Sequence, residues 1–254
     1  NALPKEEIES LKASMSENEF NREFLCDFSA AGEDQLISIS EVEAACQRHL
    51  RADQYESASL IMGCDPARFG DDASVIVFRQ GLKCEEPIEY RGLDNMQFAA
   101  KIAAQIEERH PDAVFIDVGN GSGVIDRLRQ LGHDVVEVNF GGKADSDRYV
   151  NKRTEMWHGG TKAWIAQGGV LPKHTGMKQD LATPTFYYND KNQICLESKD
   201  DIKKRLQGRS TDCGDGLGLT FAFRVTPNRD PYAAMRNSSA RVRRTADYNP
   251  LEAD

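Results

Sequence analysis

The 254-residue sequence contains no apolar run that approaches the roughly 18 residues needed to cross a bilayer. Its longest apolar runs, at 59–63, 73–78 and 113–116, have the length of strands. Six cysteines are present without a C-x-x-C pair, and five histidines without an H-x-x-x-H pair. These absences argue against a membrane span and against the usual zinc-site spacings. The cysteines are expected to be reduced and buried.

The sequence also lacks the G-x-x-x-x-G-K-[ST] loop that holds nucleotide phosphates, so no ATP hydrolysis is expected from this chain. Gly119, Gly121 and Gly123 lie between a strand pattern and a helix pattern, as in dinucleotide-binding turns. Their spacing is G-x-G-x-G, and Val124 stands where the dinucleotide motif needs its third glycine. Dinucleotide binding, with Glu137 on the ribose, is therefore only a minor alternative.

What is present is ordinary for a globular α/β protein: 39% hydrophobic and 29% charged residues. The formal net charge is −9, but it is unevenly distributed. Residues 1–60 carry 13 acidic and 5 basic side chains, and the remainder of the chain is close to neutral. Net charge therefore gives no sign of a nucleic-acid-binding protein, but it does not exclude one whose site is a group of carboxylates.

Hydrophobic periodicity predicts helices around a mixed sheet. The expected helices span residues 4–20, 40–52, 95–109, 124–131, 154–167, 200–207 and 212–224. The expected sheet strands span residues 59–64, 73–79, 87–92, 113–117 and 135–140. The first three strands follow one another through short turns, which predicts an antiparallel meander. The later strand–helix–strand order predicts parallel strands in the same sheet.

Three local patterns complete this prediction. Ser40 and Glu43 form the S-x-x-E pattern of a capping box at the start of the second helix. Residues 185–189 and 193–198 flank a short polar turn and predict a β-hairpin. Residues 225–254 have no core pattern and are expected to form a mobile tail.

Aspartates stand where this arrangement would bring them together. Asp65 and Asp117 each end a predicted strand, at the rim where open α/β sheets bind ligands. Asp212 and Asp215 lie three residues apart at the start of a helix, so they share one face. If that helix packs beside the first strand, the carboxylates converge. Hard oxygen ligands of this kind, without His or Cys, suit two Mg²⁺ or Mn²⁺ ions.

Each aspartate also has a simpler interpretation. Asp65 and Asp117 can be turn residues that follow a strand. Asp212 can be the N-cap of its helix, and Asp215 can be a first-turn carboxylate that the helix dipole stabilises. All of these interpretations would have to hold together for the metal site to be absent.

Basic residues flank the same region in two groups. As phosphate contacts they would position duplex DNA without reading its sequence. Alternatively, they form ordinary solvated faces. The first group is Lys143, Arg148, Lys152 and Arg153, and the second includes Lys199, Lys203, Lys204, Arg205 and Arg209.

Several of these segments, in this order, resemble the nuclease domain of tailed-bacteriophage large terminases. The chain departs from the family pattern at Gly214 and Gly216, where Ala is more common, and at Thr211, where Pro is more common. The segments are FNREFLCDF (20–28), GCDPARFGDD (63–72), FID (115–117), NKRTEMW (151–157), LESKDDIKKR (196–205) and GRSTDCGDGLGLTF (208–221).

The resemblance implies an RNase H-like fold: a mixed sheet whose first three strands are antiparallel, flanked by helices and extended by the hairpin. It implies a helical linker at 1–56 that follows an absent ATPase domain, a nuclease domain at 57–224 and a tail at 225–254. It also implies location in the host cytoplasm, transiently at the portal, with no membrane association.

The function implied is metal-dependent cutting of concatemeric double-stranded DNA during genome packaging. Asp65, Asp117 and one or both of Asp212 and Asp215 match the catalytic acids. DNA, the portal protein and the small terminase subunit are the implied partners. Two alternatives stay open: another RNase H-like phosphodiesterase, such as a junction resolvase, and a module that chiefly docks to the portal.

Overall fold

The computed structural model describes residues 34–67, 73–206, 208 and 210–226. The expected helix at 4–20, Arg209 and the tail from residue 227 onward lie outside the described residues. No helix in these ranges is long and apolar enough to cross a membrane.

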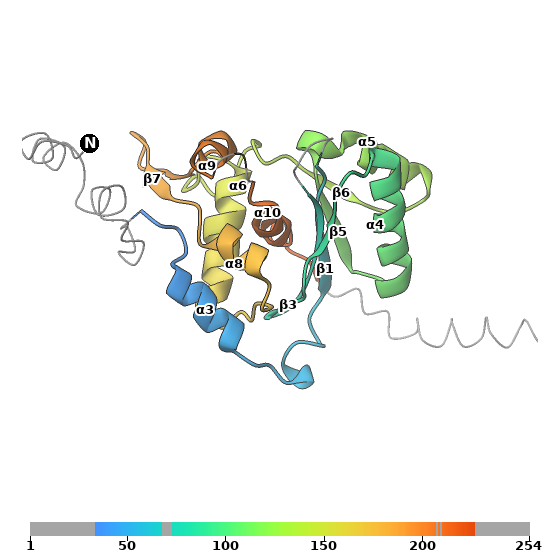
Figure 1. Cartoon of the computed structure of the whole chain (residues 1–254), viewed down its shortest axis with the longest axis horizontal. Coiled ribbons are helices and arrows are strands. Elements are labelled where there is room, and N and C mark those ends of the chain that lie inside the picture. The colour runs from blue at the N-terminus through green and yellow to red at the C-terminus, as the bar shows by residue number, and fades with distance from the viewer. Residues whose placement is uncertain (1–33, 68–72, 207, 209, 227–254) are drawn as a thin grey trace, which may run out of the picture.

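The main sheet is mixed, and its strands lie in the order β3-β2-β1-β5-β6, with β4 also paired to β2 (Figure 1). β1 and β2 are antiparallel, whereas β1 and β5, and then β5 and β6, are parallel. The expected meander and parallel crossover are therefore both present. The strands are β1 (Leu60–Asp65), β2 (Ser74–Gln80), β3 (Lys83–Cys84), β4 (Ile88–Tyr90), β5 (Ala113–Asp117) and β6 (Val136–Val138).

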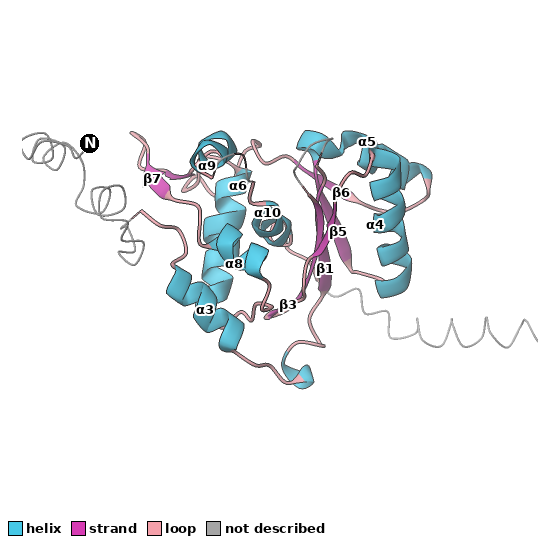
Figure 2. Cartoon of the chain, viewed as in Figure 1, coloured by secondary structure: helices cyan, strands magenta, loops and turns pink. Residues whose placement is uncertain are grey.

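Helices cover both faces of this sheet (Figure 2). α4 (Asn95–Arg109) and α5 (Val118–Gln130) lie on one face, and α10 (Asp212–Leu219) lies on the other. The short helix η1 (Ala52–Gln54) lies on the path from α3 to β1, and the other elements lie beyond α10. They are α3 (Ile39–Gln47), α6 (Lys152–Thr154), η2 (Glu155–Lys162), α7 (Ala163–Ala166), α8 (Thr175–Leu181), α9 (Lys199–Arg205) and the hairpin β7 (Phe186–Tyr188) and β8 (Ile194–Leu196).

The side chains of β2 point alternately to the two faces of the sheet, and both faces are buried. Val75 and Val77 join the core with α10, whereas Ile76 and Phe78 join the core with α4 and α5. Successive strand side chains point to opposite faces, so a strand covered on both sides needs a continuous apolar run. The described part of the expected linker also contributes to the core, through Leu36, Ile37, Val42, Ala45 and Cys46.

The structure corrects several predicted elements. α3 is capped by Ser38 with Glu41, not by Ser40 with Glu43, and it ends at Gln47. α5 begins at Val118, so the glycine-rich segment is helical and not a turn. α10 ends at Leu219, and α8 was not predicted at all. The predicted helix at 154–167 exists as α6, η2 and α7 in succession, with η2 wound as a wider π-helix.

Glycines allow α10 to approach β1 closely. A Cβ on Gly63 would lie 2.2 Å from the backbone oxygen of Gly216, and one on Gly216 would lie 2.8 Å from Val77 Cγ2. Real side chains do not tolerate such contacts. Gly63 and Gly216 thus allow α10 and its aspartates to lie directly on the first strand.

We expect Gly63→Ala to destabilise the fold by about 2–3 kcal/mol, because the new methyl group meets backbone and not a flexible side chain. Denaturant unfolding measures this. Gly141→Ala is the control, since the nearest atom to its added Cβ is 3.6 Å away. Equal stabilities of the two variants would contradict the close packing of α10 on β1.

Candidate active site

Asp65 and Asp117 are neighbours at the carboxyl ends of two parallel strands. Cys64 of β1 pairs with Ile116 of β5, so the next residue along each strand is an aspartate. Both aspartates are buried, with 5% and 7% of their surface exposed. Asp117 also caps α5, because its Oδ1 accepts a hydrogen bond from Gly119 N at 3.2 Å.

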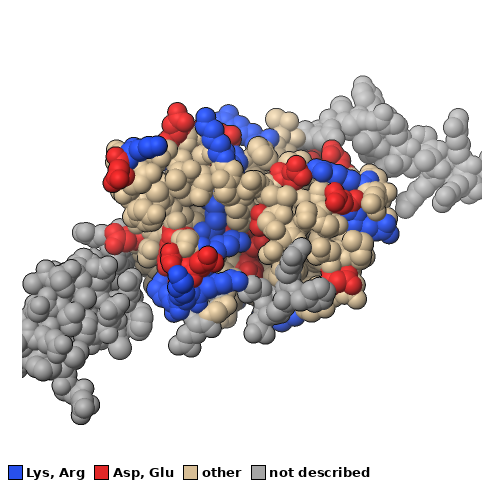
Figure 3. All heavy atoms as spheres, turned by 90° about the horizontal axis from the view of Figure 1, so that it is seen from above, with Lys and Arg blue, Asp and Glu red and all other residues tan. Residues whose placement is uncertain are grey.

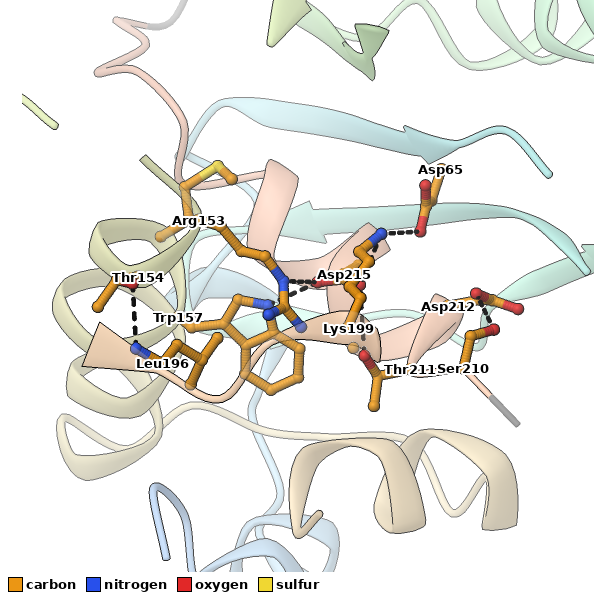
Figure 4. A network of polar contacts seen from close by, with 12 residues as sticks. Asp65, Arg153, Thr154, Trp157, Leu196, Lys199, Ser210, Thr211, Asp212 and Asp215 are labelled. Carbon is orange, nitrogen blue, oxygen red and sulfur yellow. Dashed lines mark hydrogen bonds and ion pairs between the residues drawn. The ribbon is translucent and has the colours of Figure 1, made fainter. Parts of the chain in front are cut away.

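Asp215 is the most enclosed of the acids, with 0% of its surface exposed. Its Oδ1 accepts hydrogen bonds from Arg153 Nε at 3.1 Å and from Trp157 Nε1 at 2.8 Å (Figure 4). Its Oδ2 accepts from Thr211 Oγ1 at 3.3 Å and lies 3.0 Å from Lys199 Nζ. The two oxygens therefore face different partners.

Lys199 joins the acids. Its Nζ lies 3.0 Å from Asp215 Oδ2 and 3.6 Å from Asp65 Oδ2, so one ammonium lies between two carboxylates from different elements. The ammonium also lies over the aromatic ring of Phe140, 4.6 Å from the ring centroid. In Figure 3, the molecule seen from above, acidic and basic side chains meet near the middle of the face.

Burial and neighbouring charge act differently on the three carboxylates. Burial, reinforced by Asp215, Asp117 and Asp212, raises the pKa of Asp65 well above its usual range despite Lys199. Burial also raises the pKa of Asp117 in spite of Lys199 and the Gly119 hydrogen bond.

Asp215 behaves in the opposite way. Burial works to raise its pKa, but Arg153 and Lys199, with the hydrogen bond from Trp157, bring the pKa below its usual range. Burial likewise works to lower the pKa of Lys199, and the charges of Asp215 and Asp65 more than offset this and raise it. Lys199 and Arg153 neutralise only part of the negative charge of the carboxylates at this site. A bound divalent cation would neutralise more of it.

Asp212 has a different environment. It is the first residue of α10 and not its N-cap, which is Thr211. Its Oδ2 accepts from Ala73 N at 3.1 Å, and its Oδ1 accepts from Ser210 Oγ. The interpretation of Asp212 as the N-cap is therefore wrong. Its carboxylate instead connects the residue before β2 to the start of α10. The helix start is instead capped from α8 by Asp180, whose Oδ2 accepts from Cys213 N at 2.9 Å.

The predicted DNA-contacting residues divide into three kinds. Lys143, Arg148, Lys203 and Lys204 are at least partly exposed, and Arg205 pairs with Glu197. Two others are corrected, because they are buried and already paired. Lys152 Nζ lies 2.7 Å from Asp145 and 2.9 Å from Glu155, and Arg153 holds Asp215.

Sequence reasoning missed the roles of Lys199, Arg153, Trp157 and Asp180. Lys199 and Arg153 were grouped with surface cations, since a local charge run does not reveal which member turns inward. Trp157 was not among the predicted site residues. The sequence contains only a partial indication of these roles. A residue is a candidate when its side chain is long enough to reach the acids and it lies on a segment that precedes or follows a strand end.

A second group of potential ligand atoms lies beside α10. Glu89, His174 and Cys213 place one ligand atom each within 4.8 Å of the others. His174 Nδ1 accepts a hydrogen bond from Met177 N at 3.1 Å, so in the neutral ring the proton is on Nε2, which lies 3.2 Å from Glu89 Oε1. Neither nitrogen then offers a lone pair to a metal. This group forms a hydrogen-bonded contact and not a ligand set.

Comparison with solved structures gives consistent matches. The nuclease domain of the large terminase subunit gp2 of bacterial virus Sf6 matches with a TM-score of 0.59 at 16% identity, over 75% of this chain and 99% of that chain. A K428A mutant of that domain with manganese and beta-thujaplicinol gives 0.61 at 16% identity, with the same coverage. The HK97 bacteriophage large terminase gives 0.54 at 13% identity, over 74% of this chain and 43% of that chain.

No protein-family model and no curated protein matches the sequence. The likeness is therefore one of fold. The mixed sheet, its flanking helices and the separate hairpin form the RNase H-like architecture of terminase nuclease domains, as the sequence resemblance implied.

Proposed function

We propose that this chain is the metal-dependent endonuclease domain of a phage large terminase, which cuts concatemeric double-stranded DNA during genome packaging. The observation that carries the proposal is the position of Lys199: one ammonium held between Asp65 and Asp215 at the carboxyl end of β1. A cation is already accommodated there by oxygens from separate elements. The fold shared with terminase nuclease domains supports the same function.

The residues present fit Mg²⁺ or Mn²⁺. Asp65, Asp117 and Asp215 supply hard carboxylate oxygens, and Asp65 and Asp117 end adjacent parallel strands. Lys199 marks a position where positive charge is stabilised. Bound there, two divalent ions would supply an activated water and would stabilise the leaving oxygen of a phosphodiester.

The chain's own residues would prepare that chemistry. Asp65 would lie between the other two acids, while Arg153 and Trp157 hold Asp215 in its charged form. Lys199 would leave its position between the carboxylates when a divalent ion binds, which frees its ammonium for a DNA phosphate nearby. Asp212 would serve chiefly to fix the start of α10, and thereby the position of Asp215.

Exposed cations around the site would contact the DNA backbone without reading sequence. Lys143, Arg148, Lys203 and Lys204 are the residues we assign to this role. Lys204 would leave Asp201 to do so, and Arg205 would join them only if it left Glu197. The portal protein and the small terminase subunit are the proposed partners, and the proposed setting is the host cytoplasm at the portal. A linker at 1–56, a nuclease domain at 57–224 and a tail at 225–254 remain the proposed organisation.

Supercoiled plasmid tests the proposal. With Mn²⁺ or Mg²⁺ we expect nicked and linear products, and a chelator should abolish them. ATP should make no difference, because the sequence has no phosphate-binding loop. Absence of cleavage with either ion would favour the portal-docking alternative, and strong preference for a four-way junction over plasmid would favour the resolvase alternative.

A further inference from the structure

Trp157 is held against α10 by an unusual fit. A Cβ on Gly214 would lie 2.5 Å from Trp157 Cη2, and one on Gly218 would lie 3.4 Å from Trp157 Nε1. The indole therefore occupies space that a side chain at Gly214 would otherwise take, and it lies in ordinary van der Waals contact with Gly218. Trp157 is fully buried, and its Nε1 reaches Asp215 Oδ1 at 2.8 Å.

Arg153 acts on the same oxygen. Its Nε donates to Asp215 Oδ1 at 3.1 Å, and its Nη1 donates to the backbone oxygen of Glu197 at 2.8 Å. The guanidinium is thus fixed at both ends, to α10 and to the segment that follows β8. Two donors from the α6–η2 segment therefore occupy Oδ1, and Oδ2 is the oxygen that faces Lys199.

We propose that Arg153 and Trp157 are positioning residues that reserve Asp215 Oδ1, so that Asp215 binds the metal through Oδ2 alone. Gly214 belongs to this arrangement, because a side chain at this position would displace the indole. The inference rests on the proposed function, since it concerns the same metal site. Donors behind a ligating carboxylate fix its orientation, and their loss typically costs about 10–100-fold in metal affinity or activity.

The chain provides a matched control. Its second tryptophan, Trp164, is also buried, and its Nε1 donates to the backbone oxygen of Gly81 at 2.8 Å. Trp157→Phe and Trp164→Phe therefore each remove one indole N–H donor from a buried position. Only Trp157→Phe removes a hydrogen bond to Asp215. Mn²⁺ binding is measured by the loss of the free-ion electron paramagnetic resonance signal.

We expect Trp157→Phe to weaken Mn²⁺ binding by about tenfold and Trp164→Phe to leave it unchanged. Saturating Mn²⁺ should restore most of the cleavage by Trp157→Phe, because the ligand itself is intact. Equal Mn²⁺ affinities of the two variants would overturn the inference, whether both match the wild type or both fall together.

A second measurement needs no substitution in the site. The sequence has two tryptophans, so the ¹⁵N-labelled protein gives two indole cross-peaks, which Trp164→Phe assigns. On titration with diamagnetic Mg²⁺, the Trp157 cross-peak should move with the same midpoint as metal binding measured by calorimetry, and the Trp164 cross-peak should stay. A stationary Trp157 cross-peak at saturation would overturn the inference.

These outcomes separate the inference from the proposed function. Metal binding with a moving Trp157 cross-peak but no DNA cleavage would uphold the inference and refute the nuclease. Cleavage by the wild type with a stationary Trp157 cross-peak would refute the inference and uphold the nuclease. No binding of either ion at millimolar concentration would refute both.

Discussion

Asp65→Asn is expected to lower metal-dependent DNA cleavage by at least ~100-fold while leaving the metal-free protein equally or more stable. Activity and metal-free stability respond differently, because the Asp65 carboxylate supports cleavage by binding metal but is an unfavourable buried charge when no metal is bound. Burial and neighbouring acids raise its pKa well above the usual range, so carrying the charge costs folding free energy near neutral pH. Asparagine keeps the volume and removes that cost. Plasmid cleavage and thermal unfolding in chelator measure the two effects.

The pH dependence of this stability difference has a definite sign. A carboxyl whose pKa is raised by folding destabilises the fold above that pKa, and the penalty disappears as pH falls toward its ordinary value. The stability advantage of Asp65→Asn should therefore shrink on acidification. Asp117→Asn should behave in the same way, since its pKa is also raised and asparagine can still cap α5. Wild-type cleavage by either folded variant would contradict the assigned role.

Asp215→Asn should also abolish cleavage, but it should destabilise the metal-free protein by about 3 kcal/mol. Repulsion among converging carboxylates would by itself make the neutralisation of any one of them harmless to the fold. The structure separates Asp215 from the others, because it pairs with Arg153, whose side chain is buried. Removing the negative charge leaves that guanidinium without its ionic partner.

The pH dependence of the destabilisation by Asp215→Asn follows from the lowered pKa of Asp215. Its contribution to stability is present above the unfolded-state pKa of about 4 and is lost as pH falls through the lower folded value. The destabilisation by Asp215→Asn should thus persist from pH 7 down to about pH 4. Urea unfolding at several pH values measures it. A stability equal to that of the wild type at pH 7 would show that Arg153 does not depend on Asp215.

The sequence was sufficient for the antiparallel and parallel parts of the sheet and for the positions of Asp65 and Asp117 at adjacent strand ends, because continuous apolar runs and strand-end aspartates are local patterns. It misplaced the start of α5, because Asp117 ends its strand and caps that helix at once, and it placed the end of α10 beyond Leu219. It also did not reveal that Asp180 of α8 caps the start of α10, since that contact is distant in the sequence. It also placed Arg153 and Lys152 on the surface, since burial of a cation depends on which acid the fold brings to it.

Diffraction from crystals soaked in Mn²⁺, with anomalous scattering at the manganese edge, would locate the metal directly. We expect anomalous peaks within coordination distance, about 2 Å, of the carboxylates of Asp65, Asp117 and Asp215, with Lys199 Nζ displaced from between Asp65 and Asp215. At Asp215 the contact should be through Oδ2. Manganese bound elsewhere, for example at Glu89, His174 and Cys213, with these three carboxylates unoccupied at concentrations that support cleavage, would contradict this assignment.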